Sequence, residues 1–438
     1  MFQPFSVNIP KISKMEFDLR TYGAIGDGRT SNTEAFRKAI EAAAAEGGRV
    51  IVPNGIWLTG PIRLLSGVAL HLQDNAVILF DKNPQEYPLI VTDFEGVTRI
   101  RTLSPIYAEN AENIAITGNG VINGNGHLWR PVKEFKMTKR QWKELLEKSP
   151  YVIDSKEGGI WFPSQSMYDT AITGEIFPGD YGSYEEALAA ASPHYDFYRP
   201  VMVSLRHCRN ILIEGVTLQD SAAWCLHPYF CEQLTIRDVR IKNPACAQNG
   251  DGLDVESCRF VHIHHCDFQT GDDGICLKAG KDREARKLGK PCEDVLIHDC
   301  KVGMSHGGFV IGSEMSRGVR NVLVKDCTFI DSDVGIRFKS AMGRGGIVEH
   351  IYLENILMSG IKKECLTMTM NYVLNTVSGD DPVVQSDDPE DIPTFRNIEL
   401  KNCICIDEDA HYVIQPMKGY PETIQHISIL DCELGVRK

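Results

Sequence analysis

A six-residue pattern of hydrophobic and polar positions recurs along most of the chain. Its order is apolar, any residue, apolar, any residue, polar or glycine, apolar. Alternating apolar residues predict a strand with one buried face, and the polar or glycine position predicts a bend after it. The units are residues 211–216, 234–239, 261–266, 295–300, 322–327, 351–356, 398–403 and 427–432.

The spacing of these units predicts how they are stacked. Their third residues lie 23, 27, 34, 27, 29, 47 and 29 positions apart. A repeat of about 20 to 50 residues indicates a solenoid, and units made of strands alone indicate a β-helix. A β-propeller is the rival architecture, but uneven spacing and single-strand units favour stacked coils. We therefore predict an all-β fold, a right-handed parallel β-helix, as one domain over residues 1–438.

Two segments depart from the strand pattern. Residues 35–45 have apolar residues at helical spacing after a capping-box pattern of Ser31 and Glu34, and glycines end the helix. We expect this helix to cap the open end of the strand stack. Residues 127–198 are predicted to be an insertion with helices at 139–148 and 184–191. Its many aromatic residues suit either sugar stacking or a small satellite core, and the core is favoured.

Charge and cysteine content limit the possible partners and compartment. A net charge of −13 and a pI near 5.5 argue against a nucleic-acid binder. The sequence has no apolar stretch of about 18 residues, so we expect no membrane span. Its first residues show no export-signal pattern, and no CxxC pair suggests zinc. Five of the fourteen cysteines occupy the sixth repeat position and are predicted to be buried free thiols: Cys266, Cys300, Cys327, Cys403 and Cys432. We expect a cytoplasmic protein, or a secreted one if a signal has been trimmed.

Four aspartates lie within 23 residues, among glycines, in segments 249–254 and 271–274. Asp251 and Asp272 are 21 residues apart, about one coil, so neighbouring coils could place both on one face. Cleavage of a glycosidic bond needs a carboxylic acid that protonates the leaving oxygen and a carboxylate that activates water. Crowding of like charges raises the pKa of one group and so supplies the acid. A calcium loop or plain Asp-Gly turns are the alternatives.

Four motifs, in order along the chain, resemble those of the polygalacturonase family, glycoside hydrolase family 28. The family's Asn-Thr-Asp, Gly-Asp-Asp, Gly-His-Gly and Arg-Ile-Lys motifs correspond to Asn249-Gly250-Asp251, Gly271-Asp272-Asp273, Ser305-His306-Gly307 and Arg337-Phe338-Lys339. The resemblance covers nearly the whole chain. It implies a parallel β-helix that hydrolyses pectin backbones with inversion, without a metal or another cofactor.

The resemblance also implies catalytic roles. Asp272 would be the general acid, Asp251 and Asp273 would hold and deprotonate the attacking water, and His306 would act from beside the acid. Inversion needs about 6.5–9.5 Å between the acid and base carboxyl groups. Adjacent Asp272 and Asp273 would point to opposite faces of a regular strand, so we expect the flanking glycines to let the backbone bend there.

Substrate contacts follow from the same resemblance. Arg337 and Lys339 would bind the carboxylate of a galacturonate, and alternation in a strand sends both to one face. Charge balance for nearby aspartates is the alternative for this pair. Asn249 is assigned to substrate binding, and Lys278 to contact with the substrate or an aspartate.

The implied partner is a pectic oligosaccharide or polysaccharide. Family members that act on rhamnogalacturonan tend to lack the histidine of the third motif, so His306 favours galacturonan as the substrate. The 127–198 insertion and the absent export signal favour an exo-acting enzyme. A hydrolase of another pectin backbone, a calcium-dependent pectate lyase and a non-catalytic carbohydrate-binding β-helix remain the alternatives.

Overall fold

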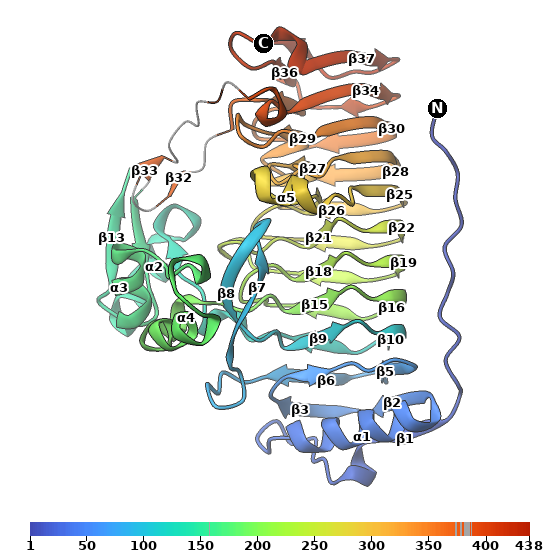
Figure 1. Ribbon diagram of the computed structural model, residues 1–438, viewed down its shortest axis with the longest axis vertical. Helices are drawn as coiled ribbons and strands as arrows, with labels where there is room; N and C mark the ends of the chain where they lie inside the picture. The colour runs from blue at the N-terminus through green and yellow to red at the C-terminus, as the bar shows by residue number, and fades with distance from the viewer. Residues whose placement is uncertain (157, 373–374, 377–378, 381–385, 387) are drawn as a thin grey trace.

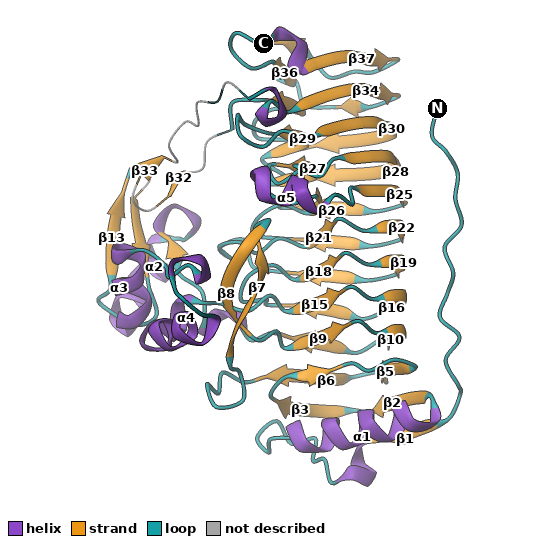
Figure 2. Ribbon diagram, viewed as in Figure 1, coloured by secondary structure: helices purple, strands orange, loops and turns teal. Residues whose placement is uncertain are grey.

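The computed structural model describes residues 1–156, 158–372, 375–376, 379–380, 386 and 388–438 (Figure 1). These residues form a parallel β-helix, which confirms the predicted fold class. The strands stack in one sheet of twenty strands and one of eleven (Figure 2).

The twenty-stranded sheet comprises β1 (Glu16–Asp18), β2 (Gly48–Val52), β3 (Gly55–Thr59), β5 (Val68–Leu72), β6 (Ala76–Phe80), β10 (Glu112–Gly118), β11 (Val121–Asn123), β16 (Arg209–Glu214), β17 (Thr217–Gln219), β19 (Glu232–Arg237), β20 (Arg240–Lys242), β22 (Arg259–His264), β23 (Asp267–Gln269), β25 (Cys292–His298), β26 (Lys301–Gly303), β28 (Val319–Ile330), β30 (Ile347–Ser359), β34 (Thr394–Lys401), β35 (Ile404–Cys405) and β37 (Ile424–Leu430). The eleven-stranded sheet comprises β4 (Ile62–Arg63), β9 (Ile106–Glu109), β15 (Val203–Arg206), β18 (Leu226–Tyr229), β21 (Leu253–Glu256), β24 (Ile275–Lys278), β27 (Gly307–Gly312), β29 (Val334–Lys339), β31 (Leu366–Thr369), β36 (His411–Gln415) and β38 (Val436–Arg437).

The register of the large sheet reproduces the sequence repeat. The third residues of successive units are paired from one coil to the next, beginning with Ile213 opposite Ile236 and ending with Leu400 opposite Ile429. These side chains face inward, where apolar residues of every coil form one continuous core. The unequal spacing in the sequence therefore reflects loops between strands that remain in register.

Each repeat turns a corner at its polar or glycine position, as predicted. The residues there have left-handed backbone angles, for example Gly215 with φ 79° and Asn355 with φ 54°. Glycine, Asn and Asp visit this conformation at the lowest cost. The sixth positions follow inside the corner. Of the five repeat cysteines, Cys432 is half-buried and the others are buried, and all five are free thiols.

Helix α1 (Thr33–Glu46) covers the N-terminal end of the stack, at the bottom of Figure 1. It buries a row of apolar residues that includes Phe36 and Ile40. The predicted capping box is wrong, because Asn32 rather than Ser31 is the N-cap residue. The side chain of Asn32 instead bonds to the backbone of Ile25, Thr30 and Leu58, which ties the helix start to the first coil.

The 127–198 segment forms a small unit of helices and strands beside the stack (Figure 2). Both predicted helices are present as α2 (Lys139–Lys148) and α4 (Tyr184–Ala191). The sequence did not predict α3 (Gln165–Thr173) or the antiparallel sheet of β12 (Val132–Lys133), β13 (Val152–Ser155) and β14 (Gly158–Trp161). Several of its aromatic residues, including Phe162 and Tyr168, pack in a satellite core, as favoured above.

An antiparallel hairpin of β7 (Leu89–Phe94) and β8 (Val97–Thr102) lies over the eleven-stranded sheet (Figure 1). The backbone of Thr102 bonds to that of Tyr198 near the base of the hairpin, and Gly96 at its tip accepts a hydrogen bond from Lys281, just after β24. Smaller elements are α5 (Asp282–Leu288), β32 (Asn375–Thr376) and β33 (Gly379–Asp380).

The first fifteen residues form an extended arm that runs along the outside of the stack (Figure 1). Hydrogen bonds join Met1 to Tyr352, Gln3 to Asn321 and Asn8 to Gln233. Among the described residues, none of the helices combines the length and hydropathy needed to cross a membrane.

Candidate active site

The four sequence motifs converge on four neighbouring strands of the eleven-stranded sheet. Asp251 lies two residues before β21, Asp272 and Asp273 lie just before β24, and His306 directly precedes β27. Arg337 and Lys339 lie on β29, the next strand in the sheet. Residues far apart in the sequence therefore meet on the outer face of one sheet.

The three aspartates predicted to be catalytic form one cluster. One carboxylate oxygen from each of Asp251, Asp272 and Asp273 lies within 4.8 Å of the other two. Because 4.8 Å is an upper limit, a point equidistant from the three atoms lies at most about 2.8 Å from each, which is a hydrogen-bond distance. The carboxylates are therefore close enough together for one water molecule to contact all three. This nearest-atom spacing is shorter than the carboxyl separation of about 6.5–9.5 Å associated with inversion.

The turn before β24 allows adjacent Asp272 and Asp273 to reach the same cluster. Both lie in a bend rather than in a strand. The flanking glycines serve close packing, since a Cβ atom at Gly271 would lie 2.5 Å from the Pro244 carbonyl oxygen. At Gly274 it would lie 2.4 Å from a methyl group of Val302.

Burial and charge separate the protonation states of the aspartates. Asp251 is 4% exposed, and burial, followed by the nearby Asp254 and Asp272 carboxylates, raises its pKa well above the ordinary value. Burial alone would also raise the pKa of Asp273, but the charge of Lys339, with that of Arg337, outweighs it and holds the pKa low. The pKa values of two neighbouring carboxyl groups are therefore shifted in opposite directions, as an acid and base pair requires.

Asp273 is held by Lys339, whose Nζ lies 2.8 Å from Oδ2 of the aspartate. Both residues are buried. Of the two roles considered for Lys339, this contact supports charge balance. Arg337 is more accessible, and its Nη1 atom has no hydrogen-bond partner among the described residues. Its guanidinium lies 5.7 Å from the centre of the Tyr372 ring. Arg337 is therefore the better placed of the two for binding a carboxylate.

Lys278 contacts carboxylates rather than the open face of the site. It is 4% exposed, and its Nζ lies 3.2 Å from Glu314 and 3.5 Å from Asp254. It also lies 4.4 Å from the centre of the Trp224 ring. Burial raises the pKa of Asp254 to about 7 against the effect of Lys278. The assignment of Lys278 to aspartate contact is thus favoured over direct substrate binding.

His306 is hydrogen-bonded to the coil before it through its backbone and to the coil after it through its ring. Its backbone N–H donates to the carbonyl of Asp272 over 2.9 Å, and its Nδ1 lies 2.9 Å from Oδ2 of Asp333. The hydrogen bond from His306 lowers the pKa of Asp333, so the carboxylate accepts and the ring donates through Nδ1. Asp333 thereby fixes the orientation of the ring.

Asn249 supports the turn that carries Asp251. Its backbone is left-handed, with φ 54°, and its Oδ1 accepts a hydrogen bond of 2.8 Å from Arg199. Arg199 also donates to the carbonyls of Gln248 and Ala222. Asn249, which the sequence assigned to substrate binding, is thus engaged within the protein.

Sequence reasoning missed several residues of the site. Asp333 and Glu314 follow their partners His306 and Lys278 by 27 and 36 residues, which is about one coil. A search for complementary charges one repeat further along could have found them. Lys136, in the insertion, carried no such signal. Its Nζ donates to the carbonyl of Gly271 over 2.6 Å, so the insertion reaches the catalytic turn.

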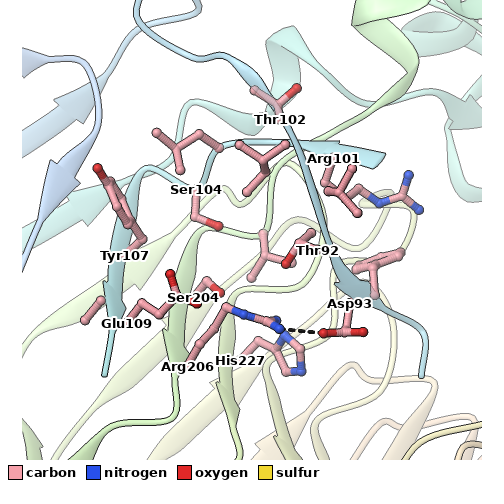
Figure 3. A pocket seen from close by; sticks show the side chains of 16 residues that line it. Thr92, Asp93, Arg101, Thr102, Ser104, Tyr107, Glu109, Ser204, Arg206 and His227 are labelled. Atoms are coloured by element: carbon pink, nitrogen blue, oxygen red, sulfur yellow. Dashed lines mark hydrogen bonds and ion pairs between the residues drawn. The ribbon is translucent and has the colours of Figure 1, made fainter. Parts of the chain in front are cut away.

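The hairpin β7–β8 covers the sheet on the N-terminal side of the aspartates. Phe94 packs on Trp224, with ring centres 4.5 Å apart. Beneath the hairpin lies a cavity of about 260 Å³ against β9 and β15, crossed by an ion pair of 2.5 Å between Arg206 and Asp93 (Figure 3). The sheet face next to the aspartates is therefore occupied by protein on this side.

Comparison with known proteins gives a family match and several similar chains. The family model of the glycosyl hydrolases family 28 matches residues 146–399. A probable polygalacturonase of Vitis vinifera is 28% identical over 80% of this chain and 62% of its own length. An exo-poly-alpha-D-galacturonosidase of Dickeya chrysanthemi is 28% identical over 84% of this chain and 58% of its own length. The chain thus spans about three fifths of these two curated relatives.

Among solved structures, a hyperthermoactive exopolygalacturonase from Thermotoga maritima has a TM-score of 0.74 and 31% identity, covering 98% of this chain and 90% of its own. An exopolygalacturonase of family 28 from Yersinia enterocolitica also has a TM-score of 0.74, at 23% identity, with coverage of 96% and 71%.

Proposed function

Because the chain belongs to the glycosyl hydrolases family 28, we propose that it hydrolyses α-1,4-galacturonosyl linkages of pectic oligosaccharides, from a chain end and with inversion. The observation that carries this proposal is the cluster of Asp251, Asp272 and Asp273, whose carboxylate oxygens lie within 4.8 Å of one another. Membership of the family supports the reaction class, and the arrangement of charges around the cluster supports the substrate class.

In the proposed mechanism Asp272 protonates the leaving oxygen. It is the least buried of the three aspartates, so a glycosidic oxygen can reach it. Asp273, held ionised by Lys339, takes the proton of the attacking water. Asp251 completes the water site, and burial raises its pKa, which favours retention of a proton within the cluster. His306 positions the Asp272 backbone.

The substrate class follows from the cation beside the cluster. Arg337 has a buried Nη1 without a partner among the described residues, and a guanidinium binds a carboxylate through two parallel hydrogen bonds. A uronic acid placed over the aspartates would satisfy it. The positive charge of Arg337 also offsets the repulsion that the aspartate cluster would otherwise exert on the carboxylates of an acidic sugar chain.

Attack from a chain end is supported by the elements around the cluster. The hairpin β7–β8 runs from the level of β9 to the loop after β24, and the insertion contacts the catalytic turn through Lys136. Both occupy the sheet face along which a long polysaccharide would otherwise continue. The sequence attributed this closure to the insertion alone.

The test is product analysis on a defined galacturonate oligomer with calcium chelated. We expect release of monogalacturonate without ultraviolet absorbance, and a loss of about 10²- to 10⁴-fold in Asp272→Asn. Asp409→Asn, an exposed aspartate of another coil, is the matched control and should retain full activity. Unsaturated products would exclude a hydrolase. A sharp fall in polygalacturonate viscosity with few reducing ends would exclude exo cleavage.

A further inference from the structure

Four histidines meet on the outer face of the twenty-stranded sheet, away from the aspartate cluster. His262 and His264 alternate with the buried residues of β22, His265 follows them, and His298 ends β25. His264 and His298 are register partners whose rings stack with centres 5.1 Å apart and 4° between their planes. We call these four residues the histidine cluster. The proposed hydrolysis does not use it.

The closest contact in the cluster joins two ring nitrogens. Nε2 of His262 lies 2.8 Å from Nε2 of His298. Nδ1 of His298 lies 2.6 Å from Oδ2 of Asp299. A carboxylate only accepts hydrogen bonds, so in the neutral ring Nδ1 carries the proton and Nε2 presents a lone pair. His262 must then donate, and one proton lies between the two Nε2 atoms.

A metal ion can take the place of that proton with little movement. Zn²⁺ binds imidazole nitrogens at about 2.0–2.1 Å, and tetrahedral angles then put two such nitrogens about 3.3 Å apart. The two nitrogens would need to separate by only about half an ångström from their present 2.8 Å. Asp299 is bonded to Nδ1 of His298, the ring nitrogen that would not bind the metal. In known metal sites a carboxylate in this position orients the metal-binding histidine.

The contact between His262 and His298 does not arise from stacking of identical residues at one register position of successive coils. The register partner of His262 on β25 is Leu296, so His262 and His298 meet diagonally and edge to edge. The register position shared by His264 and His298 holds histidine in these two coils, and Arg237 and Lys325 occupy it in the coils on either side.

The two cations that flank the cluster are each paired with a carboxylate. Arg237 is paired with Glu214 at 2.6 Å, and Lys325 with Asp326 at 3.4 Å. His262, His264 and His298 are half-buried, so a hydrated ion can reach them.

We propose that His262 and His298 form a binding site for a borderline divalent metal ion such as Zn²⁺, Ni²⁺ or Cu²⁺. Imidazole is a preferred ligand of these ions, whereas Ca²⁺ and Mg²⁺ prefer oxygen. His264 lies beside the pair, with its ring centre 4.4 Å from that of His262, and water fills the remaining positions. The ion would join two neighbouring coils through β22 and β25.

The test is calorimetric titration of tag-free, chelator-treated full-length protein with ZnCl₂ and, separately, NiCl₂ at neutral pH. The wild type should bind one ion per chain. His262→Gln and His298→Gln should each weaken binding at least tenfold, and Asp299→Asn about tenfold or more. His411→Gln, a half-buried histidine of a distant coil, is the matched control and should bind like the wild type.

Three results would overturn the proposal. The first is binding by His262→Gln and His298→Gln equal to that of the wild type, and the second is no binding by the wild type. The third is loss of binding in Asp251→Asn, which would assign the ion to the aspartate cluster. Thermal unfolding gives an independent readout, because saturating metal should raise the melting temperature of the wild type and not that of His298→Gln.

Discussion

The buried ion pair between Lys339 and Asp273 sets the pH range over which the proposed base can work. At a separation of 2.8 Å and an effective dielectric constant of about 20, two unit charges attract by about 6 kcal/mol. Each pKa unit corresponds to about 1.4 kcal/mol, so Lys339 lowers the pKa of Asp273 by up to about four units. Burial acts in the opposite direction, and the Arg337 charge supplements Lys339.

Replacement of Lys339 by Met removes the larger favourable charge and leaves the burial. In the wild type the lowered pKa keeps Asp273 ionised as the pH falls. In Lys339→Met the carboxylate should take up a proton at a higher pH, and activity should be lost there. We expect the acidic limb of the kcat profile to move up by about two units or more.

The assay is kcat against pH on a galacturonate trimer. The substrate carboxylates titrate identically in both proteins, so the difference between the profiles reports on the enzyme. In Lys339→Arg, which keeps a positive charge, the acidic limb should move less than in Lys339→Met. Lys325→Met, which removes a surface lysine on the other sheet, should leave the profile unchanged. A uniform loss of activity with an unmoved acidic limb would refute the reasoning and make Lys339 a substrate ligand only.

Three further predictions concern the insertion, the arm and the core. Lys136→Met removes the hydrogen bond to the Gly271 carbonyl and should lower kcat/KM about tenfold without changing the melting temperature, as steady-state kinetics and calorimetry would show. Deletion of residues 1–14 should lower the melting temperature by several degrees while kcat at room temperature is retained, because the arm touches no residue of the aspartate cluster. Ile297→Ala should reduce the free energy of unfolding by about 2–5 kcal/mol in a denaturant titration, whereas Leu296→Ala, its half-buried outward neighbour, should cost far less.

The sequence was informative wherever a signal repeated from coil to coil. Eight units share one pattern, and their third residues are in register from Ile213 to Ile429. The aspartate motifs precede β21 and β24, so stacking places Asp251 at the register position of Asp273, beside Asp272. In these cases the local sequence pattern and the overall fold favour the same arrangement of residues.

Contacts between segments without a common pattern could not be predicted. The hairpin β7–β8 reaches the loop at Lys281 almost two hundred residues further along the chain, and its length is unrelated to the repeat. The sequence placed the Lys278 charge near the site, but the burial of this side chain depends on its contacts with Trp224 and Glu314, which lie on other coils. The N-cap of α1 is Asn32, whose side chain bonds to four backbone groups of Ile25, Thr30 and Leu58.

The arm and the hairpin have a consequence for how the chain unfolds. In a plain solenoid each coil contacts only its neighbours, and the stack can fray one coil at a time from either end. Here the arm joins the coil of Tyr352 to those of Asn321 and Gln233, and the hairpin joins the coils of β9 and β24. Opening of a single coil therefore breaks contacts with coils that are not adjacent to it. This coupling along the axis makes unfolding cooperative, so that the aspartate cluster is kept intact until the stack melts as a whole.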